Sequence, residues 1–87
     1  MHEARVVRDV VNRVEDVAAV EHAVSVDRIR VRLGAQSHVT PESFAGHFEL
    51  LAADSVVAGA ELDIERSTDQ NDPGAHDIRL VSVVVRA

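Results

Sequence analysis

The chain has 87 residues, of which 46% are hydrophobic and 28% charged, and its net charge is −6. This length allows one small domain with a modest core, and the negative charge argues against nucleic acid as a partner, because phosphates require a basic surface. The absence of Cys excludes thiolate metal sites. The sequence has neither an apolar run long enough for a membrane span nor a basic leader typical of a signal peptide. We therefore expect a cytoplasmic protein with no membrane contact.

An amphipathic helix is predicted over residues 3–20. Its apolar residues recur at spacings of three and four, which places them on one stripe of a helix. The stripe consists of Val6, Val7, Val10, Val11, Val14, Val17 and Ala18. Because most of these residues are β-branched and form helices poorly, packing of the stripe must provide much of the stability of this helix.

A period of two replaces the helical period over residues 26–33 and predicts a strand that ends before Gly34. One face of this strand is apolar and the other is basic: Ile29, Val31 and Leu33 alternate with Arg28, Arg30 and Arg32. We interpret the arginines as a solvated sheet face. Binding of an anionic partner is the less favoured alternative.

A second helix is predicted from Pro41 to about Ala53. Thr40 is a typical N-cap, and Pro41 and Glu42 suit the first turn. The expected buried stripe is Phe44, Phe48, Leu51 and Ala52.

Two more strands follow, separated by a polar loop over residues 67–77 with a turn signal at 71–74. In residues 60–65 three acidic side chains alternate with apolar ones, and we expect them to pair with the arginines across the sheet. Residues 78–86 are nearly continuously apolar, so we place this strand at the centre of the sheet or covered on both faces, antiparallel to the strand at 60–65. The predicted fold class is α+β, with two helices packed on a three-stranded mixed sheet in the order α-β-α-β-β and a right-handed crossover around the second helix.

The N-terminal sequence Met1-His2-Glu3 carries metal-binding chemistry. The imidazole of His2 and the α-amine of Met1 can bind one divalent ion, and the amide nitrogens of residues 2 and 3 complete a roughly square-planar set. Such a set suits nickel(II) or copper(II) and suits zinc(II) poorly. Glu3 supplies a carboxylate, either as an extra ligand or as a partner that orients the ring. The alternative is a solvated His2 on a frayed terminus.

The order of elements and several motifs resemble the HypA/HybF family of nickel-insertion accessory proteins for hydrogenase and urease maturation. The matching segments are Met1-His2-Glu3, 26–34, Pro41-Glu42-Ser43-Phe44, Phe48-Glu49-Leu50-Leu51, 59–65 and 78–85. The resemblance covers nearly the whole chain and implies His2 as the main nickel ligand, with the Met1 amine and Glu3 nearby. It also places His38 close to the N-terminus, as a secondary ligand or, more simply, as a solvated loop residue.

The sequence departs from the family in one large respect. Family members carry a zinc domain between the second and third strands, built on two Cys-x-x-Cys pairs, whereas this chain has no Cys and has residues 67–77 at that place. We therefore expect a single HypA-like domain over residues 1–87 with no zinc, which must fold without the free energy that a structural zinc site contributes.

The other histidines are weaker candidates. His47 lies beside Phe48 on the predicted second helix, and we favour a packing role for it over a ligand role. His22 follows the first helix, where a cation suits the helix dipole. His76 lies among acidic residues of the loop, for which a solvated turn is the favoured interpretation.

Two functions follow as expectations. The leading one is a metallochaperone that binds nickel(II) transiently and delivers it to the large subunit of a nickel enzyme, or works with a nickel-insertion GTPase. The alternative is a metal-independent HypA-like interaction or structural subunit that joins a larger complex or forms a homo-oligomer through an open sheet. Catalysis is not expected, because there is no Cys and the Ser residues lack a nucleophile elbow or base motif; a small enzyme acting through His38 or an Asp cluster is the least favoured hypothesis.

Overall fold

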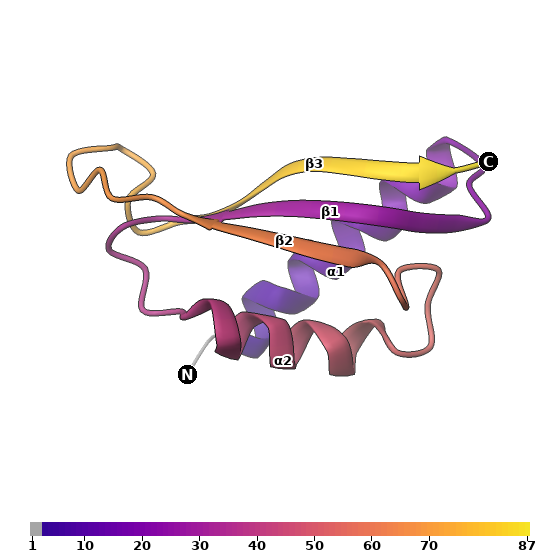
Figure 1. Cartoon of the computed structure of the whole chain (residues 1–87), viewed down its shortest axis with the longest axis horizontal. Coiled ribbons are helices and arrows are strands. Elements are labelled where there is room, and N and C mark those ends of the chain that lie inside the picture. Colours follow the sequence, from indigo (N-terminus) through magenta and orange to yellow (C-terminus); the bar gives the residue numbers. More distant parts are fainter. Residues whose placement is uncertain (1–2) are drawn as a thin grey trace.

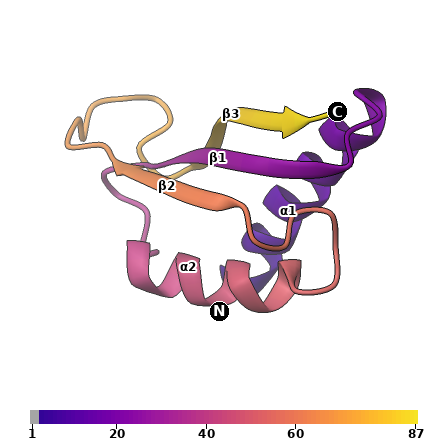
Figure 2. The ribbon, with the colours of Figure 1, turned by 45° about the vertical axis from the view of Figure 1, so that its right-hand side comes forward.

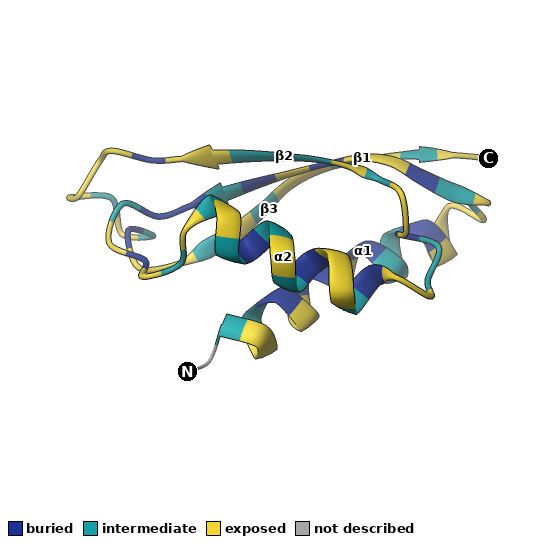
Figure 3. Cartoon of the chain, turned by 60° about the horizontal axis from the view of Figure 1, so that its bottom comes forward, coloured by how far each residue is buried: buried dark blue, intermediate teal, exposed yellow. Residues whose placement is uncertain are grey.

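The structure is a computed structural model and describes residues 3–87. Two helices lie on one side of a three-stranded sheet and leave the other side open (Figures 1 and 3). The elements in chain order are α1 (Glu3–Val20), β1 (Ser25–Leu33), α2 (Pro41–Ala52), β2 (Glu61–Arg66) and β3 (Ile78–Arg86). The predicted fold class and element order are confirmed, with strand and helix ends that differ by about one residue from those expected.

The strand order in the sheet is β2-β1-β3. The central strand β1 pairs parallel with β2, where Ile29 is opposite Leu62, and antiparallel with β3, where Ile29 is opposite Val83. The parallel pair β1–β2 is joined through α2, as expected, because parallel neighbours need a crossover connection. Figure 2 shows β1 between the other two strands.

The prediction for the last strand is therefore wrong in two respects. β3 is an edge strand, and it pairs with β1 and not with β2. Its run of apolar residues concealed an alternation that is interrupted by a register shift at Val81, and Val81 and Val84 are 47% and 50% exposed. The central strand is β1, whose inward residues Ile29 and Val31 are fully buried.

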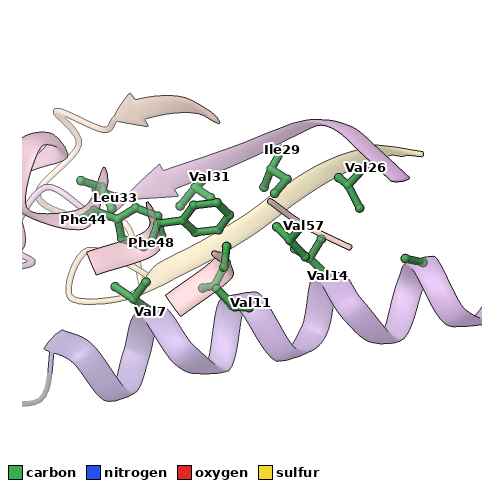
Figure 4. Close-up of a cluster of buried hydrophobic side chains, with 13 residues drawn as sticks. Val7, Val11, Val14, Val26, Ile29, Val31, Leu33, Phe44, Phe48 and Val57 are labelled. Carbon is green, nitrogen blue, oxygen red and sulfur yellow. The ribbon is translucent and has the colours of Figure 1, made fainter. Parts of the chain in front are cut away.

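The core lies between the sheet and the two helices (Figure 4). Phe44 and Phe48 of α2 stack with their ring centroids 6.1 Å apart, and they fill the space below β1. Most residues of the stripe predicted for α1 are buried in this core, while Val6 and Val17 are only half-buried. The buried core residues are Val7, Val10, Val11, Val14, Ala18, Val26, Ile29, Val31, Leu33, Phe44, Phe48, Ala52 and Val57.

Charged side chains cover the open face of β1 and β2 in three rows. The pairs are Arg28–Glu61 at 3.2 Å, Arg30–Asp63 at 3.3 Å and Arg32–Glu65 at 3.8 Å. This confirms the expected pairing across the sheet. Because these side chains are about half exposed, each pair contributes little, roughly 0–1 kcal/mol, which agrees with a solvated face.

The loop of residues 67–77 is tied to the end of β1. The N–H of Gly34 donates to the carbonyl of Asp77 (2.8 Å), and a Cβ at Gly34 would lie only 2.2 Å from the carbonyl oxygen of Ala75. A glycine is needed there because any side chain would collide with the loop. Within the loop, the predicted turn is stabilised by the Gly74 N–H, which donates to Asp72 Oδ1 (2.9 Å). None of the helices within residues 3–87 has the length and hydropathy to cross a membrane.

Candidate metal centre

Glu3 is the member of the predicted N-terminal site that the structure describes, whereas Met1 and His2 lie outside the described residues. Glu3 is the first residue of α1, and its carboxylate is directed to α2. Its Oε2 accepts a hydrogen bond from Ser43 Oγ and lies 2.7 Å from Nδ1 of His47. The carboxylate therefore joins the start of α1 to the first half of α2.

Local sequence positions the two α2 partners. Thr40 is the N-cap, as predicted, and its Oγ1 accepts from the backbone N–H of Ser43 (3.1 Å). Ser43 and His47 are four residues apart, so they share one face of the helix. That face is turned to the N-terminal end of α1, with Glu3 21% exposed and His47 40% exposed at their side chains.

The contacts of His47 determine which ring nitrogen carries the hydrogen. Its Nδ1 is 2.7 Å from Glu3 Oε2 and 3.0 Å from the carbonyl oxygen of Ser43. A carboxylate and a carbonyl only accept hydrogen bonds, so we assign an N–H to Nδ1. In the neutral ring, Nε2 then has a free lone pair. The packing role predicted for His47 is incomplete, because the ring is partly exposed and is hydrogen-bonded to Glu3.

An open groove lies beside this cluster and has a volume of about 680 Å³. Glu3 and Arg13 of α1 line it, together with His38 of the β1–α2 loop and His76 of the β2–β3 loop. The structure thus places the exposed His38 in the same groove as Glu3, and its role as a secondary ligand stays a prediction. His22 is different: it follows the C-terminal end of the 18-residue α1, about 27 Å from Glu3 at 1.5 Å per residue.

Within residues 3–87, no three His, Asp or Glu side chains are grouped so that they could hold a metal ion. The described part of the site is a carboxylate–imidazole pair, which is too few donors for a divalent transition metal. A complete metal centre at this position needs donors from the residues that precede Glu3.

A family model described as "Hydrogenase/urease nickel incorporation, metallochaperone, hypA" matches residues 1–71. The chain belongs to the HypA family. Among its relatives, the hydrogenase maturation factor HypA of Methylocella silvestris is 37% identical over 65 residues, which is 75% of this chain and 58% of the relative. The factor of Deinococcus radiodurans is 36% identical over 66 residues, 76% of this chain and 55% of the relative. The chain thus spans little more than half the length of these HypA relatives.

Two solved structures share the fold. The solution structure of the Ni metallochaperone HypA from Helicobacter pylori superposes with a TM-score of 0.82 at 23% identity and covers 100% of this chain and 99% of that chain. A second solution structure of HypA protein has a TM-score of 0.75 at 23% identity and covers 98% and 96%. At this identity the likeness establishes the α+β fold of HypA for the present chain.

Proposed function

We propose that this HypA-family chain binds nickel(II) at its N-terminus as a transient cargo and delivers it during maturation of hydrogenase or urease. The observation that carries the proposal is that the family match begins at residue 1 and includes Met1-His2-Glu3. In this role the chain is a carrier and not an enzyme. Its partners are the large subunit of a nickel enzyme or a nickel-insertion GTPase, and its compartment is the cytoplasm.

The donor chemistry at the start of α1 supports nickel. The α-amine of Met1, the imidazole of His2 and backbone amide nitrogens form a nitrogen-rich set of the kind that nickel(II) accepts in square-planar geometry. The first four N–H groups of a helix have no intrahelical acceptor. The amide nitrogen of Glu3, which begins α1, can therefore bind nickel without breaking a helical hydrogen bond.

The tether of Glu3 to α2 supports a defined position for this site. Successive Cα atoms are about 3.8 Å apart, so holding Glu3 against Ser43 and His47 limits the region that His2 can reach. Glu3 and the secondary candidate His38 line one groove. We further propose that residues 1–87 act as a single domain in which the loop 67–77 takes the place of a zinc domain.

The direct test is a nickel titration of untagged protein with its native N-terminus, followed by calorimetry and d–d absorbance. We expect a one-to-one site whose d–d absorbance is lost in His2→Ala and kept in His22→Ala, a control about 27 Å away. Equal nickel affinity in wild type and His2→Ala would overturn the proposal.

A second pair of variants tests the backbone ligand. Glu3→Ala and Glu3→Pro both remove the carboxylate, but only proline removes the amide hydrogen that nickel must displace. Proline is tolerated at the first position of a helix, so both variants are expected to fold. We expect Glu3→Pro to lose the d–d band of wild type and Glu3→Ala to keep it, and a band that survives in both would exclude the amide nitrogen of Glu3 as a ligand.

One observation favours the alternative, a metal-independent interaction or structural subunit. Within residues 3–87, β3 pairs with β1 on one side and with no strand on the other, and its open face carries the exposed Val81 and Val84. Such an edge can pair with a strand of another protein or of a second copy. Complex or homo-oligomer formation that is weakened by Val84→Lys but insensitive to nickel and to His2→Ala would favour this function.

A further inference from the structure

We propose that His47 of α2 supplies an imidazole ligand to the N-terminal nickel ion through its Nε2, in addition to the nitrogens of the N-terminal set, and that the carboxylate of Glu3 orients this ring instead of binding the ion. The inference rests on the proposed nickel-binding function. It adds a donor from a different element of the fold, far from the N-terminal motif in sequence.

The hydrogen bonds of His47 are those of a metal-binding histidine. Such residues generally donate their second ring N–H to a carboxylate or a backbone carbonyl, which fixes the tautomer and the ring orientation. His47 has both kinds of acceptor at Nδ1, namely Glu3 Oε2 at 2.7 Å and the Ser43 carbonyl oxygen at 3.0 Å. Among residues 3–87, every hydrogen bond of the ring involves Nδ1. Nε2 is thus the nitrogen prepared for a metal.

The position of the ring is the second argument. Its side chain is 40% exposed, so an ion can approach it from solvent. Nδ1 touches the carboxylate of the residue that directly follows His2 in the chain. The imidazole of His47 is therefore held by the residue next to His2 in the chain, and it adds a donor where residues 3–87 alone lack a set of three.

The state of the Glu3 carboxylate is the third argument. Its Oε2 already accepts from the hydroxyl of Ser43 and from Nδ1 of His47. An oxygen engaged by two donors is a weak additional ligand, and orientation of the neighbouring imidazole is the role that these contacts perform. His38 lines the groove that Glu3 also lines, but its ring has no carboxylate partner within the described residues, whereas that of His47 does, so we assign the added donor to His47.

Three substitutions separate ligation from structure. His47→Asn keeps an N–H close to the position of Nδ1 and removes Nε2, whereas His47→Ala removes both. His76→Ala is the matched control, because it deletes an exposed imidazole from the groove that Glu3 lines. We expect His47→Asn to weaken nickel binding at least tenfold, the lower end of the loss seen even for partners of metal ligands, and to remove one imidazole from the X-ray absorption pattern of bound nickel. His76→Ala should leave both quantities unchanged.

The tautomer gives a readout that is independent of metal affinity. In metal-free protein, long-range ¹⁵N–¹H NMR of the neutral His47 ring should report the hydrogen on Nδ1, and one equivalent of nickel should perturb the resonances of this ring. The assignment of His47 as a ligand would be overturned if His47→Asn and wild type had the same nickel affinity and the same number of bound imidazoles. If His2→Ala still abolished binding in that case, the proposed nickel function would stand. Full binding in His2→Ala would remove both proposals together.

Discussion

The contact between Glu3 and His47 has a measurable free energy in the metal-free protein. The Nδ1–Oε2 distance of 2.7 Å is that of a charge-assisted hydrogen bond, and hydrogen bonds to charged groups contribute roughly 1.5–3 kcal/mol to stability. His47 is 40% exposed, so solvent screening lowers this range. We expect a coupling free energy of about 1 kcal/mol between the two side chains.

A double-mutant cycle measures this coupling. Urea unfolding of wild type, Glu3→Ala, His47→Ala and the double variant gives the coupling as the deviation from additivity. Glu3→Ala combined with His22→Ala is the control, since residues about 27 Å apart should be additive. A Glu3–His47 coupling within the roughly 0.3–0.5 kcal/mol scatter of independent sites would refute the tether between α1 and α2.

Three further predictions concern stability. Gly46 lies in the middle of α2 with nothing near its missing Cβ, so Gly46→Ala should stabilise by about 1 kcal/mol and raise the Tm in thermal unfolding by about 4–8 °C; the contrasting Gly59→Ala, at φ +81°, should lower the Tm because alanine is strained there. Gly34→Ala should cost about 1–3 kcal/mol and speed hydrogen exchange in the loop 67–77, because its Cβ would lie 2.2 Å from the carbonyl oxygen of Ala75; unchanged exchange would contradict the close approach. Phe44→Ala should cost about 3–5 kcal/mol in urea unfolding, since the ring is fully buried, and a loss under about 1 kcal/mol would show that the core relaxes around it.

The helices and the first two strands were predictable because each has one buried face with a clear period. α1 has apolar residues at helical spacing, and β1 alternates between buried apolar residues and arginines. β3 was placed wrongly because valines occupy both of its faces. Val83 packs on the core and Val84 is half exposed, so the sequence alone did not distinguish a covered strand from an edge strand.

The contact between Glu3 and His47 was outside the reach of periodicity. The two residues are 44 positions apart, and the contact forms only because α1 and α2 cover the same side of the sheet with the start of α1 beside α2. Spacing did place Ser43 and His47 on one face of α2. It contained no information on which side chain of another helix that face would meet.

The side chain and the backbone amide of Glu3 have different roles in the fold. Its side chain is occupied within the protein, where Ser43 and His47 hold the carboxylate. Its backbone amide is free of helical hydrogen bonding, because α1 begins there. A helix that started several residues earlier would use this N–H in its own ladder. A carboxylate without partners on α2 would leave the start of α1 without this tie to α2. The nickel site that we propose at this end of the chain therefore depends on where α1 starts and on which face α2 turns to it.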